Sequence, residues 1–259
     1  MKTSERLAGA RRVVIKVGSS SITGSNEANL DRIVDLSWRL SRAGKQVILV
    51  SSGAIATASP LIGLTAKSED LATSQALASI GQAKLMGRYE RSLARYNWLP
   101  GQILLTVDNL DQEATSINAS RALERLLEIG VLPIINENDS VATQEIRFGD
   151  NDQLAARVAA LAQADVLVLL SDVDALYTAP PSEPGAMPIE VVPYGDELSH
   201  ISVSGTSTGY GTGGALTKLA AARMATDQGV GVVLTSTANV DRIDTDSCRH
   251  TWFEPAAAK

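Results

Sequence analysis

The sequence contains little that binds transition metals or forms disulfides. Among 259 residues there are one cysteine, Cys248, and two histidines, His200 and His250. A single cysteine excludes an intrachain disulfide and a Cys-rich zinc site. Two histidines provide few metal ligands, which argues against a metallohydrolase. Neither histidine has the context of a catalytic triad, so we expect all three residues to be structural or exposed.

Long apolar runs and excess positive charge are also missing. The longest apolar runs, such as VLVLL at 166–170, are far short of the roughly 20 residues that span a membrane. The N-terminal MKTSERLAGARR lacks the apolar core of a signal peptide. Lys and Arg number 23 against 29 Asp and Glu, which gives a formal net charge of −6. We therefore expect a cytoplasmic protein that binds neither nucleic acid nor a membrane. Any anionic substrate must be captured by local basic groups.

The common nucleotide-binding and hydrolase motifs are absent or lack the context they need. A Walker A loop ends in Gly-Lys-Ser/Thr, but the only Gly-Lys pair, Gly44-Lys45, is followed by Gln46. The dinucleotide fingerprint G-x-G-x-x-G begins at Gly211 but has Leu216 at its third glycine position. The G-x-S-x-G pattern of a nucleophile elbow occurs at Gly205–Gly209, but no predicted strand leads into it, as an elbow requires. These observations argue against a P-loop NTPase, a Rossmann dehydrogenase and an α/β-hydrolase.

The sequence does contain alternating apolar strands and amphipathic helices. Short aliphatic runs predict buried parallel strands at 13–17, 47–50, 103–106, 131–136, 166–170 and 230–235. Helical patterns lie between them, at 30–44, 68–96, 111–129, 153–163 and 216–229. This alternation predicts an α/β fold, a three-layer αβα sandwich with a mostly parallel open central sheet. We expect one domain over residues 1–259, with the proline-rich segment 178–195 as an excursion or hairpin.

Polar loops follow four of the predicted strands. They are GSSS at 18–21, SSGAIA at 51–56, ENDS at 137–140 and SDVDALYT at 171–178. Each alone is ordinary turn chemistry. Ligands of open α/β sheets, however, bind at the carboxyl ends of the strands. Four such loops at one edge of the sheet therefore predict a binding site there.

Two lysines accompany glycine-rich segments and indicate phosphate chemistry. Lys16 ends an otherwise apolar strand and precedes Gly18, where loop amides can form an anion-binding nest. The stretch GTSTGYGTGGALTK, 205–218, could be a flexible linker or a second anion-binding loop. We favour the loop because Lys218 lies at the start of an amphipathic helix. Phosphoryl transfer needs little beyond positioning, charge neutralisation and a bound divalent metal.

Several motifs, in order and at familiar spacing, resemble the amino acid kinase family, in particular its members that phosphorylate glutamate. They are SSGAIA (51–56), PIINENDSVAT (133–143), FGDNDQLAARVA (148–159), LLSDVDALYT (169–178) and GTGGALTK (211–218). The resemblance extends from Arg12 to about Phe253. It implies an amino acid kinase-like fold and ATP-dependent phosphorylation of the γ-carboxylate of L-glutamate, the first step of proline biosynthesis. ATP and L-glutamate would be the substrates, and Mg²⁺ would accompany ATP.

The resemblance also implies a role for individual residues. Lys16 and Lys218 would stabilise the transferring phosphoryl group, and Asp152 would position both lysines. Glutamate would contact Ser52, Asp139 and Asn151, with Asp139 opposite the α-ammonium group. The residues expected to contact ATP are Lys16, Gly18, Ser19, Ser171, Asp172, Thr212, Gly213, Gly214, Ala215, Leu216, Thr217 and Lys218. The acceptor carboxylate is already ionised at neutral pH, so no general base is needed. We expect no dedicated protein ligands for Mg²⁺, which the ATP phosphates would mainly hold.

Some positions depart from the family pattern. Ala215 stands where relatives usually have methionine in GTGGM, and LLTVDN, with Val107 and Asn109, stands in place of LLTRDD. Many bacterial members also carry a C-terminal RNA-binding-like (PUA) domain, which we do not expect within residues 1–259.

Two other functions remain open at this point. One is another kinase of the same superfamily, such as an acetylglutamate or uridylate kinase, which would lack NEND together with GDND. The other is a non-catalytic amino acid or nucleotide sensor, which would lose the two lysines.

Beyond its substrates, we expect the chain to form a homo-oligomer, a dimer or a tetramer, with helix 68–96 supplying apolar contact surface. The next enzyme, glutamyl phosphate reductase, is a candidate partner.

Overall fold

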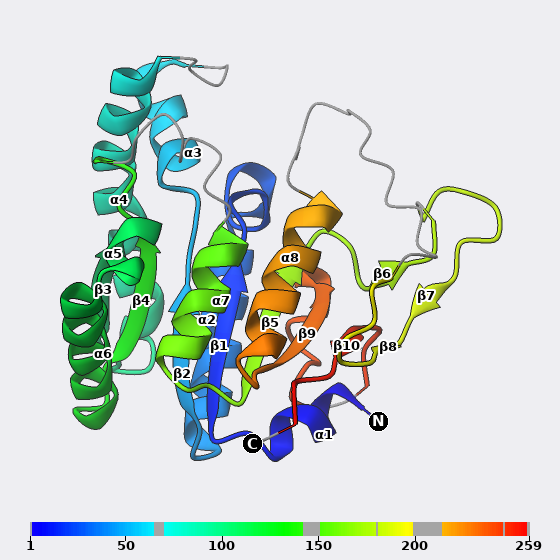
Figure 1. Cartoon of the computed structure of the whole chain (residues 1–259). Coiled ribbons are helices and arrows are strands. Elements are labelled where there is room, and N and C mark those ends of the chain that lie inside the picture. Colours follow the sequence, from blue (N-terminus) through cyan, green and yellow to red (C-terminus); the bar gives the residue numbers. More distant parts are fainter. Residues whose placement is uncertain are drawn as a thin grey trace.

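The structure is a computed structural model that describes residues 2–64, 70–141, 151–179, 181–198, 214–245 and 247–257. Its centre is an eight-stranded sheet in the order β3-β4-β2-β1-β5-β9-β10-β8. Pairing is parallel from β3 to β9 and again between β10 and β8, and it is antiparallel between β9 and β10. The predicted mostly parallel open sheet is therefore confirmed (Figure 1).

The predicted strands are confirmed with shifts of at most three residues. They are β1 (Arg12–Val17), β2 (Gln46–Val50), β3 (Pro100–Leu105), β4 (Leu132–Glu137), β5 (Val166–Ser171) and β9 (Gly231–Ser236). Within the proline-rich segment, β6 (Leu176–Tyr177) and β7 (Pro188–Ile189) pair antiparallel, so this part is a hairpin. The next strand, β8 (Val191–Val192), joins the main sheet beside β10 (Thr251–Phe253). The sequence did not indicate β10, because three residues are too few to show a period.

The helices follow the predicted order. The long ones are α2 (Asn29–Arg42), α4 (Leu71–Ala94), α6 (Glu113–Glu128), α7 (Asn151–Leu161) and α8 (Gly214–Asp227). Short helices that the sequence did not indicate are α1 (Thr3–Ala8), α3 (Ala54–Ala58) and α5 (Val107–Asp111). Single 3₁₀ turns include η1 (Ser19–Ser21), η2 (Gly24–Asn26), η3 (Ser59–Ile62) and η5 (Thr237–Asn239). None of the helices in the described part of the chain is long and apolar enough to cross a membrane.

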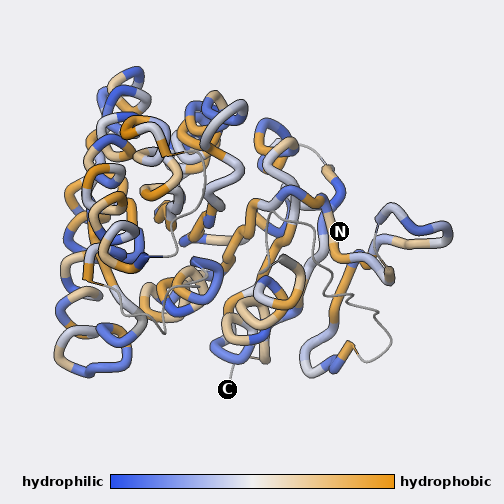
Figure 2. The backbone as a smooth tube through the Cα atoms, turned by 90° about the horizontal axis from the view of Figure 1, so that it is seen from above, coloured by the Kyte–Doolittle hydropathy of each residue, from blue (hydrophilic) through white to orange (hydrophobic). Residues whose placement is uncertain are grey.

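The helices cover both faces of the sheet and create two apolar cores. Strand β1 alternates between them: Ile15 and Val17 pack with residues of α2 and α4, whereas Val14 packs with residues of α6, α7 and α8. In Figure 1, α7 and α8 lie in front of the strands and α2 lies behind them. Figure 2 shows apolar residues gathered on the central strands and on the inner sides of the helices. The three-layer αβα sandwich is thus confirmed.

The predicted helix 111–129 is α6, and a separate short helix, α5, precedes it. Gln112 has an extended backbone (φ −89°, ψ 115°) that separates α5 from α6. A capping box begins α5 earlier than the apolar pattern indicated: Thr106 Oγ1 accepts a hydrogen bond from the Asn109 amide, and Asn109 Oδ1 accepts one from the Thr106 amide. Asn109, one of the departures from the family pattern, therefore has a structural role here.

Candidate active site

The loops that the sequence singled out meet at one edge of the sheet. Parallel pairing places the carboxyl ends of β1, β2, β4 and β5 side by side, at the upper edge in Figure 1. The loop after β9 joins them, because the Thr237 hydroxyl lies 3.0 Å from Ser21 Oγ and 3.2 Å from the Ser171 carbonyl oxygen. The predicted meeting of these loops at one edge of the sheet is therefore confirmed.

Lys16, Asp152 and Lys218 form a buried ionic cluster. Lys16 projects from β1 on the same face as Val14, toward α7, because side chains two residues apart share a face of the strand. Its ammonium group contacts Oδ1 of Asp152. The ammonium group of Lys218, one turn into α8, lies 3.0 Å from Oδ2 of the same carboxylate. One aspartate in the first turn of α7 thus holds two lysines from two other elements.

The electrostatics of this cluster favour the charged form of the aspartate. Asp152 is fully buried, and only 16% of the Lys218 side chain is exposed. Burial opposes ionisation of Asp152, but the charges of Lys16 and Lys218 and the hydrogen bonds from both outweigh it and lower the pKa of the carboxyl group. Two ammonium groups on one carboxylate leave a local excess of one positive charge. Such a site suits an anionic group such as a phosphoryl group.

The loop after β1 lies close to this cluster and to the loop after β2. Gly18 precedes η1, and a Cβ added to it would lie 3.8 Å from Lys16 Nζ. Gly53 in the second loop has φ +96°, a conformation that favours glycine, and a Cβ there would lie 3.3 Å from Ser19 Cα. Gly18 and Ser19, predicted to contact phosphate, are therefore next to Lys16 and packed against the loop that contains Ser52.

Asn151 is held by the loop after β2 and by the end of β4. It is buried at the start of α7, and its Nδ2 donates to the Ser51 carbonyl oxygen at 2.6 Å and to Asn136 Oδ1 at 2.8 Å. Ser52, the next residue after Ser51, is half-buried in the same loop. Two of the three residues predicted to bind glutamate are thus connected through a single backbone carbonyl.

Asp139, the third predicted glutamate contact, follows β4 beside a second acidic residue, Glu137. Burial raises the pKa of Asp139 to about 6. Burial, with smaller contributions from the charges of Asp139 and Asp108, raises the pKa of Glu137 to about 7. Glu137 is only 4% exposed, and its Oε1 has no hydrogen-bond partner among the described residues. Two carboxyl groups that are costly to ionise would be stabilised by a bound cation.

The predicted ATP contacts are only partly within the described residues. Ser171 ends β5, and its hydroxyl donates to Asp172 Oδ1 at 2.9 Å. The α8 helix begins at Gly214, so Ala215, Leu216, Thr217 and Lys218 occupy its first turns. Leu216 is 58% exposed and does not contribute to the core. Thr212 and Gly213 lie outside the described residues, as do His200 and the stretch from Gly205 to Tyr210.

The sequence analysis assigned no role to several polar residues that contact this site. Asn136 and Glu137 lie inside the quoted motif PIINENDSVAT, and a polar pair ending an apolar strand is the signal that could have indicated them. Thr237 lies in the polar run TSTAN (235–239) at the end of a predicted strand, which is a signal of the same kind. Gln82 lies in a predicted helix, and only the tertiary structure places it here.

Comparison with known proteins agrees with this geometry. The profile of the amino acid kinase family matches residues 11–236. Glutamate 5-kinase from Clavibacter michiganensis subsp. michiganensis is 54% identical over 257 residues, which cover 98% of this chain and 99% of that protein. Glutamate 5-kinase from Leifsonia xyli subsp. xyli is 52% identical over 252 residues, 97% of this chain and 93% of that protein.

A solved structure resembles the fold at low sequence identity. Carbamate kinase from Giardia lamblia bound to AMP-PNP has a TM-score of 0.65 and 14% identity, covering 96% of this chain and 99% of that one. This likeness supports the architecture and leaves the substrate to be argued from the site.

Proposed function

This chain belongs to the amino acid kinase family, and from that premise we propose that it is an ATP-dependent kinase that phosphorylates the γ-carboxylate of L-glutamate. The product would be L-glutamyl 5-phosphate, the first intermediate of proline biosynthesis. The observation that carries the proposal is the pairing of Lys16 and Lys218 with the two oxygens of one buried carboxylate, Asp152.

The two lysines would act on the phosphoryl group as it moves between the substrates. In the transition state, negative charge spreads over the oxygens of the transferring group, and fixed positive charges there lower the barrier. Asp152 keeps both ammonium groups in place without itself touching the reacting atoms. A non-catalytic sensor would not need this arrangement, so the cluster favours an enzyme over the sensor alternative.

ATP would lie across the loops after β1 and β5 and the start of α8. Gly18 and Ser19 lie next to Lys16, while Ser171 ends the neighbouring strand β5 and Asp172 follows it. Residues 212–218 would complete the phosphate contacts beside Lys218. The first turn of α8 presents backbone amides and the positive end of its dipole, which favour phosphate.

Mg²⁺ would enter bound to the ATP phosphates, whose charge it would partly neutralise. The donor set fits this: Asp152 is committed to two lysines, and no group of three His, Cys, Asp or Glu among the described residues could form a metal site. Asp172 belongs to the loop expected to contact ATP, and its Oδ1 accepts a hydrogen bond from the Ser171 hydroxyl.

Glutamate would bind beside α7, with Ser52, Asp139 and Asn151 as its contacts. The side-chain carboxylate would face the lysines, and the α-ammonium group would face the acidic residues after β4. Asp139 and Glu137 are both destabilised in their charged forms, and a bound ammonium group would offset that cost. N-acetylation would remove this positive charge. The site therefore favours a free amino acid over an acetylated one or a nucleotide.

An acceptor assay tests the proposal directly. ATP consumption is measured with glutamate, aspartate, N-acetylglutamate and UMP at equal concentrations. We expect turnover with glutamate at least about tenfold above each of the others, because a site that pairs a buried charge discriminates strongly against ligands that leave it unpaired. Activity with N-acetylglutamate or UMP alone would reject glutamate as the substrate, and no activity with any acceptor would favour a sensor.

Two further features belong to the proposal. A second copy of the chain would bind where Leu61, Ile62 and Ile80 expose 59%, 52% and 40% of their surface around η3 and α4, which sedimentation in solution would test.

The reaction would take place in the cytoplasm, where ATP is available, and the labile acyl phosphate would pass to glutamyl phosphate reductase.

A further inference from the structure

Four side-chain amides form a continuous hydrogen-bonded chain from the surface of the protein to Asn151. Asn151 Nδ2 donates to Asn136 Oδ1 at 2.8 Å, and Asn136 Nδ2 donates to Gln82 Oε1 at 2.7 Å. Gln82 Nε2 then donates to Gln102 Oε1 at 3.1 Å. The residues come from α7, β4, α4 and β3, so the chain joins four separate elements.

Backbone groups fix the direction of this chain. The Ser51 carbonyl oxygen can only accept, so the group of Asn151 that faces it at 2.6 Å is the NH₂ group. The Glu137 amide can only donate, so the atom of Asn136 that faces it at 2.9 Å is the oxygen. Asn136 must therefore direct its own NH₂ group away from Asn151, toward Gln82. An acceptor at position 82 completes the only arrangement in which every contact pairs a donor with an acceptor.

This direction decides what Asn151 can offer to a ligand. Both hydrogens of its amide are taken, one by Ser51 and one by Asn136. The side chain can then interact with a ligand only through Oδ1, an acceptor. Of the polar groups of glutamate, the α-ammonium group is the donor that matches it, whereas both carboxylates are acceptors.

A reversal of the Asn136 amide would destroy this preference. Asn136 is 2% exposed and Asn151 is 7% exposed, so water has little access to repair a mismatch. With Asn136 turned over, its NH₂ group would face both the NH₂ group of Asn151 and the backbone amide of Glu137. Two donor–donor contacts in a buried site would displace Asn151 from its present position.

The place of Gln82 is itself tightly determined. Its neighbour Gly81 is buried against the start of α3, and a Cβ at Gly81 would lie 1.7 Å from the Ala54 carbonyl oxygen. Helix α4 therefore approaches α3 so closely that only glycine fits at position 81. The contact brings the half-buried side chain of Gln82 to the end of β4.

We propose that Gln82 is a positioning residue for the substrate amino group. Its Oε1 holds Asn136 in the orientation that takes up a hydrogen of Asn151 and leaves the Asn151 oxygen for the α-ammonium group of the substrate. This inference rests on the proposed function, because it assumes that Asn151 contacts glutamate. It assigns to α4 a part in substrate selection through two intermediate residues.

The test compares two charged substitutions of opposite hydrogen-bonding character at one position. Gln82→Glu retains an acceptor for Asn136, and the amide of the exposed Gln102 can turn to donate to it. Gln82→Lys places a donor against the Asn136 NH₂ group. We expect Gln82→Lys to raise the KM for glutamate about tenfold, with the KM for ATP within about twofold of wild type. Gln82→Glu should stay within about threefold of wild type for both substrates.

Two control variants separate positioning from simple loss of packing. Gln82→Met removes the acceptor without adding charge and should also raise the KM for glutamate, to an extent between the other two. Lys84→Met, at an exposed position on the same helix, should leave both KM values unchanged. If Gln82→Met does not fold, the Glu and Lys pair still decides the question, because both place a charge at the same half-buried position.

The outcomes distinguish this inference from the proposed function. A wild-type protein that does not turn over glutamate would reject the proposed function. Wild-type turnover with equal KM values for glutamate in Gln82→Glu and Gln82→Lys would reject the positioning role alone. The same rejection would follow if Gln82→Lys changed the KM values for ATP and glutamate by equal factors, since that indicates general damage to the structure.

Discussion

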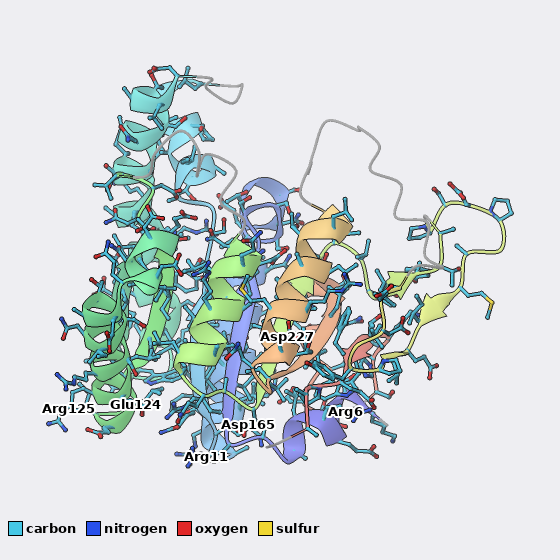
Figure 3. All side chains as sticks on the ribbon, viewed as in Figure 1. Arg6, Arg11, Glu124, Arg125, Asp165 and Asp227 are labelled. Atoms are coloured by element: carbon cyan, nitrogen blue, oxygen red, sulfur yellow. The ribbon has the colours of Figure 1, made fainter. Side chains whose placement is uncertain are left out.

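The two edges of the sheet differ in how their buried charged side chains are paired. At the amino edge, Arg12 is buried and each of its side-chain nitrogens has an acceptor. At the carboxyl edge, Glu137 is buried, and one of its carboxylate oxygens has no hydrogen-bond partner among the described residues. The Arg12 guanidinium group donates to Glu124 Oε1 at 2.5 Å and to Oε2 at 2.9 Å, and to Gln46 Oε1 at 2.9 Å. Asp165 on the same edge accepts from the amides of Arg11 and Arg12, both at 2.8 Å. Figure 3 shows Arg11, Glu124 and Asp165 together at the lower end of the strands.

This difference in pairing indicates that the amino edge serves stability and the carboxyl edge serves binding. Charges at the amino edge are paired within the folded chain, so they need no ligand. At the carboxyl edge, burial raises the pKa values of Asp139 and Glu137, so ionising them in the ligand-free protein costs free energy. Between the unfolded and folded pKa values the folded state binds more protons, so the free energy of unfolding falls as the pH rises through this window. A bound ammonium group would offset that loss.

The largest expected effect is on turnover, from a change at the carboxyl edge. Lys218→Ala should lower kcat about 100- to 1,000-fold and leave the KM for glutamate within about twofold, because the lysine would act mainly on the transition state. Steady-state kinetics with both substrates measure this. Lys84→Ala, an exposed lysine on α4, serves as the control. A variant with normal kcat and a raised KM would contradict the assigned role.

The next effect is on stability, from a change at the amino edge. Arg12→Met should lower the free energy of unfolding by about 3 kcal/mol, because it removes a buried, multiply hydrogen-bonded charge and leaves its acceptors unpaired. Urea unfolding measures this, and kcat at a temperature where the variant is folded should be unchanged. Arg125→Met should cost less than about 0.5 kcal/mol, since the Arg125–Glu128 pair is exposed at 72% and 59%. An Arg12 variant that stayed fully stable but lost activity would break the division between the two edges.

The same division explains how far the sequence could predict the molecule. The strands and long helices were predictable because apolar periodicity is a local signal, and the carboxyl edge followed from the rule that parallel strands end together. The pairing of Lys16 and Lys218 on Asp152 agrees with the roles that the family resemblance implied. The short helix α5 was missed, because five residues begun by the Thr106–Asn109 capping box are too few to show an apolar period.

What the sequence could not reveal depends on contacts between distant segments. Gln82 and Asn136 are 54 positions apart, and no local pattern in the sequence indicates that their side chains are hydrogen-bonded. Burial of Glu137 is equally invisible, because a glutamate after an apolar strand ordinarily faces solvent. The amide chain and the two destabilised carboxyl groups are tertiary properties, and both lie at the edge that binds ligands.

The smallest expected effect concerns the pH dependence of glutamate binding at the carboxyl edge. Asp139 and Glu137 are neutral below their pKa values of about 6 and about 7 and become carboxylates above them. An ammonium group is held by the ionised forms, so the Kd for glutamate should fall about tenfold as the pH rises from 5.5 to 7.5. Calorimetry without ATP measures this and avoids titration of the nucleotide phosphates. Binding should also release protons, since the bound ammonium group lowers both pKa values.

Matched variants assign this pH dependence to its source. Asp139→Asn should weaken binding and flatten the profile near pH 6, whereas Glu137→Gln should remove the part near pH 7 because neither amide can ionise. Glu128→Gln, an exposed change near the opposite edge, should leave the profile unchanged. A wild-type Kd that is constant across this range would show that the acidic pair does not contact the amino group. The contrast between paired charge at one edge and unpaired charge at the other would then need a different explanation from substrate binding.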